Sequence, residues 1–190
     1  MNEEYFCEPK SYTTPYSKSK IASEKRAWEM IKEINDKPER KENKLEMVMV
    51  LPSLITGPLM VKEMSSSVKA FSEVLDGTSA GMIPYYARAI DVRDCADGHL
   101  KALETAPFKR YAMIQKHFWI EDVGKWISEE FTKFGYNPVT KINGTFALWL
   151  GSWFDKDAHY FYGAANVEMS INTDMTKEDL KLDYIDIMIG

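Results

Sequence analysis

The segment Leu45–Leu51 constrains the fold most strongly, because it is apolar at every position except Glu46. It follows a charged stretch at 37–44 and ends at Pro52. A nearly continuous apolar run of this length is typical of a strand buried on both faces, as strands of parallel sheets are. Residues 52–58 would form the turn at its carboxyl end, where ligands bind in open α/β sheets.

Segments with helical spacing alternate with short extended segments along the rest of the chain. The first helix is expected from about Tyr16 to Asn35, with Thr13 or Thr14 as a cap and Pro15 in its first turn. Further helices are predicted at 64–76, 94–104, 120–134 and 146–154, and extended segments at 87–92 and 109–115. This alternation predicts an α/β protein.

Composition excludes several classes of function. The 190 residues fit one domain, and 29 acidic residues outnumber 24 Lys and Arg, which form no basic block, so no nucleic-acid partner is expected. The longest apolar stretch, 45–61, contains a glutamate, prolines and a glycine, which argues against a membrane span. Cys7 and Cys95 form no CxxC motif, which favours a reduced, cytoplasmic protein.

The three histidines, at positions 99, 117 and 159, are isolated in the sequence, so no metal site is predicted. The cluster of Asp91, Arg93 and Asp94 falls between a predicted strand and a predicted helix. We interpret it as a helix cap rather than a catalytic group. Trp149 and Trp153 lie on a short apolar helix, where core packing is expected over a role in a substrate pocket.

Tyr16 and Lys20 are the residues with the most chemical potential. They stand four positions apart, so a helix places them on one face, one turn from each other. A positive charge beside a phenol favours its ionised form, and such a tyrosine can serve as a general acid or base. The spacing alone, however, is more typical of a solvated helix surface than of a reactive pair.

Three motifs favour a catalytic role for Tyr16 and Lys20. The first is Tyr16-x-x-x-Lys20 with its helix, the second is 50–59 followed by 65–69, and the third is 90–99 followed by 109–112. Together, in this order, they resemble the short-chain dehydrogenase/reductase superfamily. Within it they are similar to the extended, dihydroflavonol-reductase-like branch of the NAD-dependent epimerase/dehydratase families, and the resemblance covers almost the whole chain.

The resemblance implies a role for each matching residue. Tyr16 would donate the proton to a substrate carbonyl, and Lys20 would bind the nicotinamide ribose and activate Tyr16. Ser67 matches a position that approaches the cofactor. The nicotinamide carboxamide would be held by the backbone around Pro52, Ser53, Leu54 and Ile55. The cofactor would be NADP or NAD, with NADP preferred, and the partner a small carbonyl compound.

The family's glycine-rich phosphate loop has no counterpart among the ten glycines of this sequence, and the Ser/Thr partner of the tyrosine is not identified. We therefore expect the C-terminal part of a Rossmann-like doubly wound sheet plus a small substrate-binding region, without the N-terminal strands. Residues 1–190 would form a single incomplete domain. Its active-site helix, strand and nicotinamide-side loop would be 15–60, and 61–109 and 135–190 would be mostly substrate-binding.

Three functions stay open at this stage. The first is an NAD(P)H-dependent reductase of a ketone or aldehyde, the second a sugar-nucleotide epimerase or dehydratase, and the third a non-catalytic binding or assembly protein. Three explanations fit the missing dinucleotide-binding half. Another chain supplies it, the gene model is truncated, or the protein has lost catalysis. The activity of the chain on its own is open for the same reason.

Overall fold

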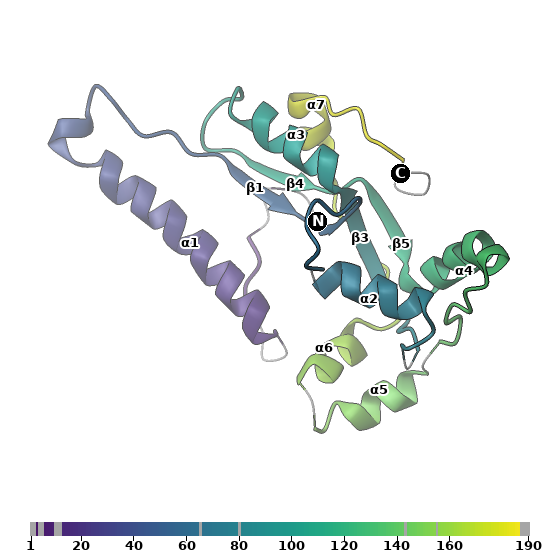
Figure 1. Ribbon diagram of the computed structural model, residues 1–190. Coiled ribbons are helices and arrows are strands. Elements are labelled where there is room, and N and C mark those ends of the chain that lie inside the picture. The colour runs from purple at the N-terminus through teal and green to yellow at the C-terminus, as the bar shows by residue number, and fades with distance from the viewer. Residues whose placement is uncertain are drawn as a thin grey trace.

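The computed structural model describes residues 3, 6–9, 13–64, 66–79, 81–142, 144–154 and 156–186. Its elements alternate helices with short strands, as the sequence predicts (Figure 1). In chain order they are α1 (Pro15–Asn35), the 3-10 turn η1 (Pro38–Arg40), β1 (Met49–Pro52), β2 (Leu54–Thr56), α2 (Ser66–Leu75), β3 (Tyr86–Asp91), α3 (Val92–Ala102), β4 (Arg110–Met113), β5 (Lys116–Trp119), α4 (Ile120–Phe131), the 3-10 turn η2 (Thr132–Phe134), α5 (Thr145–Gly151), α6 (Lys156–Ala164) and α7 (Asp174–Leu180).

The strands form two small sheets. In the first, β1 pairs in parallel with β4, and Met49 lies opposite Arg110. In the second, β3 is central, with β2 parallel on one side and β5 antiparallel on the other. Two contacts join the sheets: the Ser53 N–H donates to the Met113 carbonyl at 3.1 Å, and the Gln115 N–H donates to the Ala89 carbonyl at 2.9 Å.

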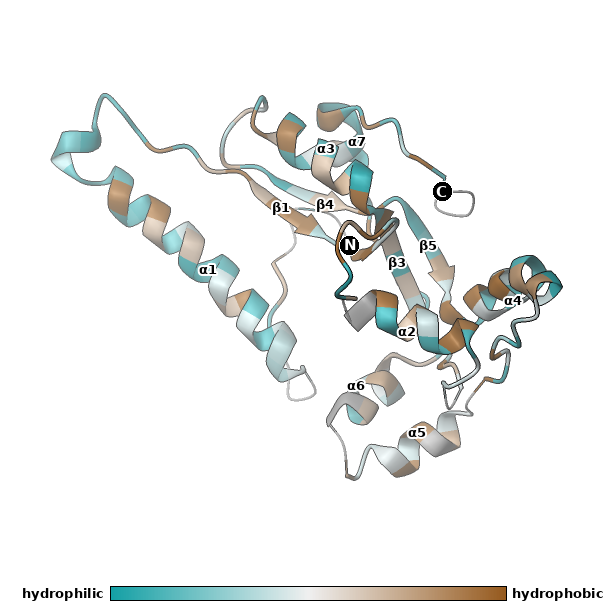
Figure 2. Ribbon diagram, in the orientation of Figure 1, coloured by the Kyte–Doolittle hydropathy of each residue, from teal (hydrophilic) through white to brown (hydrophobic). Residues whose placement is uncertain are grey.

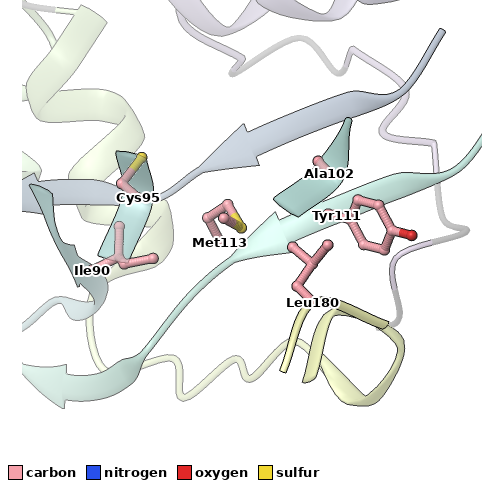
Figure 3. Close-up of a cluster of buried hydrophobic side chains, with 6 residues drawn as sticks. All are labelled: Ile90, Cys95, Ala102, Tyr111, Met113 and Leu180. Atoms are coloured by element: carbon pink, nitrogen blue, oxygen red, sulfur yellow. The ribbon is translucent and has the colours of Figure 1, made fainter. Parts of the chain in front are cut away.

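Each sheet buries a separate hydrophobic cluster. The first cluster lies between β4, α3 and α7, and Figure 3 shows its six buried side chains: Ile90, Cys95, Ala102, Tyr111, Met113 and Leu180. The second is formed by Ala87, Ala89, Phe118 and Val123, with partly buried residues of α2 and α4 against it. In each cluster, side chains of the helices and of the strands bury one another, and this burial holds the helices against the strands.

The strand predicted at 45–51 forms only in part. β1 begins at Met49, and its first three residues are half-buried and Pro52 is exposed, rather than buried on both faces. Among the described residues β1 pairs with β4 alone, so its second edge lacks the neighbour that would bury it. Figure 2 shows apolar residues along this short strand.

Several other expectations need correction. Residues 54–56, predicted as part of a turn, form β2, because they pair with β3. Strand β5 and helix α6 were not predicted from the sequence. Trp153 is 70% exposed and Trp149 is 38% exposed, so the expectation of core packing for these two side chains is wrong, and Phe131 in the predicted helix 120–134 is 39% exposed. Trp149 lies on α5 and Phe131 at the end of α4, and Trp153 lies in the turn after α5.

The helix cap predicted at Asp91 is confirmed. Its carboxylate accepts hydrogen bonds from the Arg93 backbone N–H at 2.8 Å and from the Arg93 guanidinium. These hydrogen bonds lower the pKa of the Asp91 carboxyl. Asp94 accepts from the Ile185 N–H at 2.9 Å, which fixes the C-terminal segment to α3. Both carboxylates therefore have structural partners.

Two glycines in helices give a test of this packing. A Cβ on Gly124, in α4, would lie 2.7 Å from the Val139 carbonyl oxygen, whereas a Cβ on Gly163, in α6, would meet no atom within 4 Å. We expect Gly124→Ala to lower the free energy of unfolding by about 1–3 kcal/mol through overpacking. Gly163→Ala should raise it by up to about 1 kcal/mol through helix propensity. Urea unfolding checks both, and equal effects of the two changes would contradict the packing described.

Candidate active site

Helix α1 begins as its sequence predicts. The Thr14 side chain accepts a hydrogen bond from the Ser17 N–H at 3.1 Å, and Pro15 is the first helical residue. A threonine cap satisfies one of the free N–H groups of the first turn, and proline has no N–H to satisfy there. The expected cap is thus Thr14, and it places Tyr16 in the first turn of the helix.

The structure brings Tyr16 and Lys20 together. The Lys20 ammonium lies 5.7 Å from the centre of the Tyr16 ring, within the range of a cation–π contact. Tyr16 is 70% exposed and Lys20 is exposed too. No hydrogen bond or ion pair to either side chain occurs among the described residues. The phenol and the ammonium are therefore adjacent and open to a ligand.

Helix α1 lies to one side of the two sheets (Figure 1) and is tied to them by Arg110, the first residue of β4. The Arg110 guanidinium donates to Glu24 of α1 at 2.6 Å and to the Glu3 carbonyl oxygen at 2.5 Å. It also stacks 4.0 Å from the Phe6 ring. This contact was missed from the sequence, because Glu24 and Arg110 are distant along the chain and neither belongs to a motif.

A second tie holds the C-terminal end of α1. The Asn35 side-chain amide donates to the Leu45 carbonyl at 2.9 Å, and its oxygen accepts from the Leu45 N–H at 2.8 Å. This paired hydrogen bond fixes the chain just before β1. Together with Arg110 it sets the position of α1, while the first turn with Tyr16 lies beyond both ties.

The residues expected at the nicotinamide lie where β1 ends and β2 begins. The Ser53 hydroxyl donates to the Met113 carbonyl at 2.9 Å, so the two parallel strands are joined at their carboxyl ends. Leu54 is half-buried and Ile55 is 37% exposed on β2, and Pro52 ends β1. Ser67 falls in α2, but its side chain lies outside the described part of the structure.

The predicted site is thus present as two separate parts. One is the Tyr16–Lys20 pair, and the other is the turn from Pro52 to Ile55. No hydrogen bond, ion pair or ring contact between described residues joins them. Within the described ranges no cluster of His, Cys, Asp or Glu could hold a metal ion. A search of the same residues found no helix with the length and hydropathy of a membrane span.

No family model matches the sequence. Two proteins of Saccharomyces cerevisiae are similar to the sequence. The chain is 30% identical over 135 residues to the putative uncharacterized oxidoreductase YDR541C, and the match covers 66% of this chain and 38% of that protein. It is 29% identical over 136 residues to the NADPH-dependent methylglyoxal reductase GRE2, covering 67% of this chain and 36% of that protein. The predicted resemblance is confirmed. The chain is a homologue of the Gre2-like reductases in the NAD-dependent epimerase/dehydratase family.

Solved structures give the same fold. Gre2 from Candida albicans superposes with a TM-score of 0.69 at 22% identity, covering 99% of this chain and 54% of that protein. PA4631, a nucleoside-diphosphate-sugar epimerase from Pseudomonas aeruginosa, gives 0.68 at 17% identity and covers 98% and 56%. The chain therefore spans about half the length of these structures, and its α/β fold is the predicted part of a Rossmann-like reductase.

The tie between α1 and β4 can be tested within one helix. Glu24 is 17% exposed where it meets Arg110, whereas Glu33 is 60% exposed where it pairs with Arg26. We expect Glu24→Ala to lower the free energy of unfolding by about 1–3 kcal/mol, since the buried Arg110 guanidinium loses its carboxylate partner and keeps only its other contacts. Glu33→Ala should leave it almost unchanged, because its ion pair is exposed to solvent. Amide hydrogen exchange along α1 should rise only in the Glu24 variant, and equal exchange in both would contradict this anchoring.

Proposed function

We propose that this chain carries the proton-transfer pair and the nicotinamide-side turn of an NADPH-dependent carbonyl reductase. The observation that carries the proposal is the pairing of Tyr16 and Lys20 on the first turns of a capped helix, with both polar groups accessible. The homology to a reductase described as NADPH-dependent supports the choice of NADPH over NADH.

The residues present fit one end of the cofactor. A phosphate cradle needs closely spaced glycines, and no three of the ten glycines in the sequence have that spacing. The turn at the carboxyl ends of β1 and β4, in contrast, stands where open α/β sheets bind ligands. Lys20 and residues 52–55 would therefore hold the nicotinamide and its ribose, and a further dinucleotide-binding unit would hold the phosphates.

The proposed reaction divides the work between cofactor and chain. When bound, NADPH supplies a hydride to the carbonyl carbon and becomes NADP⁺. The Tyr16 hydroxyl gives its proton to the carbonyl oxygen, which completes the alcohol. Lys20 donates hydrogen bonds to the ribose hydroxyls and stabilises the phenolate left on Tyr16. Solvent then returns a proton to the exposed phenolate, because Tyr16 is 70% exposed.

This proposal predicts a specific loss of turnover. Co-expressed with the dinucleotide-binding half of a Gre2-like reductase, the chain should consume NADPH in the presence of a small ketone or aldehyde. Tyr16→Phe should reduce the rate by at least about 100-fold, because the general acid is removed. Tyr136→Phe, at another exposed tyrosine, should leave the rate unchanged. Retained turnover in Tyr16→Phe would refute the assigned role.

A second reaction class uses the same pair. A sugar-nucleotide epimerase or dehydratase would return the hydride to the substrate, so NADPH or NADH would be recycled without net consumption. The fold shared with an epimerase is compatible with this chemistry. Product formation from a nucleotide sugar at constant cofactor absorbance would favour it over the reductase.

A non-catalytic binding role is the third candidate, and the separation of Tyr16 from the nicotinamide-side turn favours it. The half-buried β1, paired only with β4 in the described part, offers an edge for another strand. Calorimetric titration of the folded chain with NADPH and NADH separates the cases. The non-catalytic role would be supported if the chain binds neither dinucleotide and if co-expression with the dinucleotide-binding half gives no NADPH consumption.

A further inference from the structure

A cavity of about 320 Å³ lies at the carboxyl end of β4, on the side of the molecule that carries α7. This volume is at the lower end of the range for small-molecule pockets. Three parts of the chain line it: the junction of β4 and β5, the segment 170–173 that crosses it, and the first turn of α7. The lining residues are Ile114, Gln115, His117, Ser170, Ile171, Asn172, Thr173, Asp174 and Lys177.

The His117 side chain lines the cavity, and two contacts hold its ring in place. The Ile171 N–H donates to His117 Nε2 at 3.3 Å, so the ring accepts at Nε2 and carries its proton on Nδ1. Tyr86 stacks on the same imidazole, with ring centres 6.0 Å apart. The ring is thus fixed by two neighbours, and its Nδ1–H is the donor that stays available.

Two cations stand near this imidazole. Arg88 of β3 lies directly opposite His117 of β5 in the strand register, so both side chains leave the same face of the sheet. Lys177 of α7 lines the cavity itself. Neither cation forms a hydrogen bond or ion pair with the described residues. Arg88 is half-buried, and a half-buried guanidinium without a partner is unfavourable.

Two acids lie near the imidazole and keep their negative charge, because their hydrogen-bond donors are neutral. Asp174, which also lines the cavity, accepts a hydrogen bond from the Asn172 amide at 2.8 Å, and Glu168 is hydrogen-bonded to Tyr86. Burial lowers the pKa of His117, and Arg88 and Lys177 lower it further. Among the charged groups, the two cations therefore dominate at His117, which favours an anion beside this ring.

We propose that this cavity binds a small oxyanion, a carboxylate or a phosphate, through the Lys177 ammonium and the Nδ1–H of His117. Arg88 supplies additional positive charge from the neighbouring strand. The site is separate from the Tyr16–Lys20 pair and does not depend on reductase activity. Both candidate anions offer the same acceptor oxygens, and the experiment below distinguishes them.

NMR titration of the ¹⁵N-labelled chain tests the site. Sodium phosphate or sodium acetate replaces sodium chloride at constant ionic strength. We expect saturable shifts in the amides of Gln115, His117 and 171–177 with at least one of the two anions, and the tighter anion identifies the ligand class. The bound anion should also raise the pKa of His117, because it favours the imidazolium.

Variants complete the test. Lys177→Gln should weaken binding about tenfold or more, as expected for loss of a charge-assisted hydrogen bond. Arg88→Gln should weaken it less and should not destabilise the fold, since it removes an unpaired charge. Lys62→Gln, at an exposed lysine after β2, should leave binding unchanged. Shifts that do not saturate with either anion, or equal affinity in Lys177→Gln and Lys62→Gln, would overturn the proposal.

Discussion

The parallel pairing of β1 with β4 is the constraint on which the rest of the structure depends. It brings together segments about 60 residues apart in the chain, from Met49 opposite Arg110 to Pro52 opposite Met113. One end of this pair carries the Arg110 guanidinium, which holds Glu24 of α1 and the N-terminal segment. The other end carries Ser53, which is tied to the Met113 carbonyl. Both parts of the candidate site are thus positioned by a single pair of strands.

The same pair also couples the candidate site to the second sheet. Gln115 follows β4 and donates its N–H to Ala89 of β3, so the chain passes from one sheet to the other directly after the Met113 carbonyl. The nicotinamide-side turn and the anion cavity therefore lie on either side of the same short connection. A displacement of β4 would alter both, and it would also reach the Tyr16–Lys20 pair through the Arg110–Glu24 tie of α1.

Local signals in the sequence predicted the parts of this fold that local chemistry decides. Thr14 and Pro15 mark the start of α1, and Asp91 marks the start of α3, because a cap requires only neighbouring residues. Strands β2 and β5 have three and four residues, and they exist because β3 offers both of its edges. Pairing of that kind is decided by residues far away in the chain. The Glu24–Arg110 contact and the exposure of Trp153 are invisible in the sequence for the same reason.

The resemblance predicts Tyr16 and Lys20 as the reacting residues, and the structure adds a condition for the proposed chemistry. A phenol and an ammonium act on each other most strongly when water is excluded, since the effective dielectric falls. Tyr16 is 70% exposed, and α1 is tied to the body through Glu24 and Asn35 rather than through its first turn. The described residues thus set the spacing of the pair without enclosing it. The proposed proton transfer would therefore be most effective with a surface that covers the first turn of α1 and leaves the Lys20 ammonium free to meet a ribose.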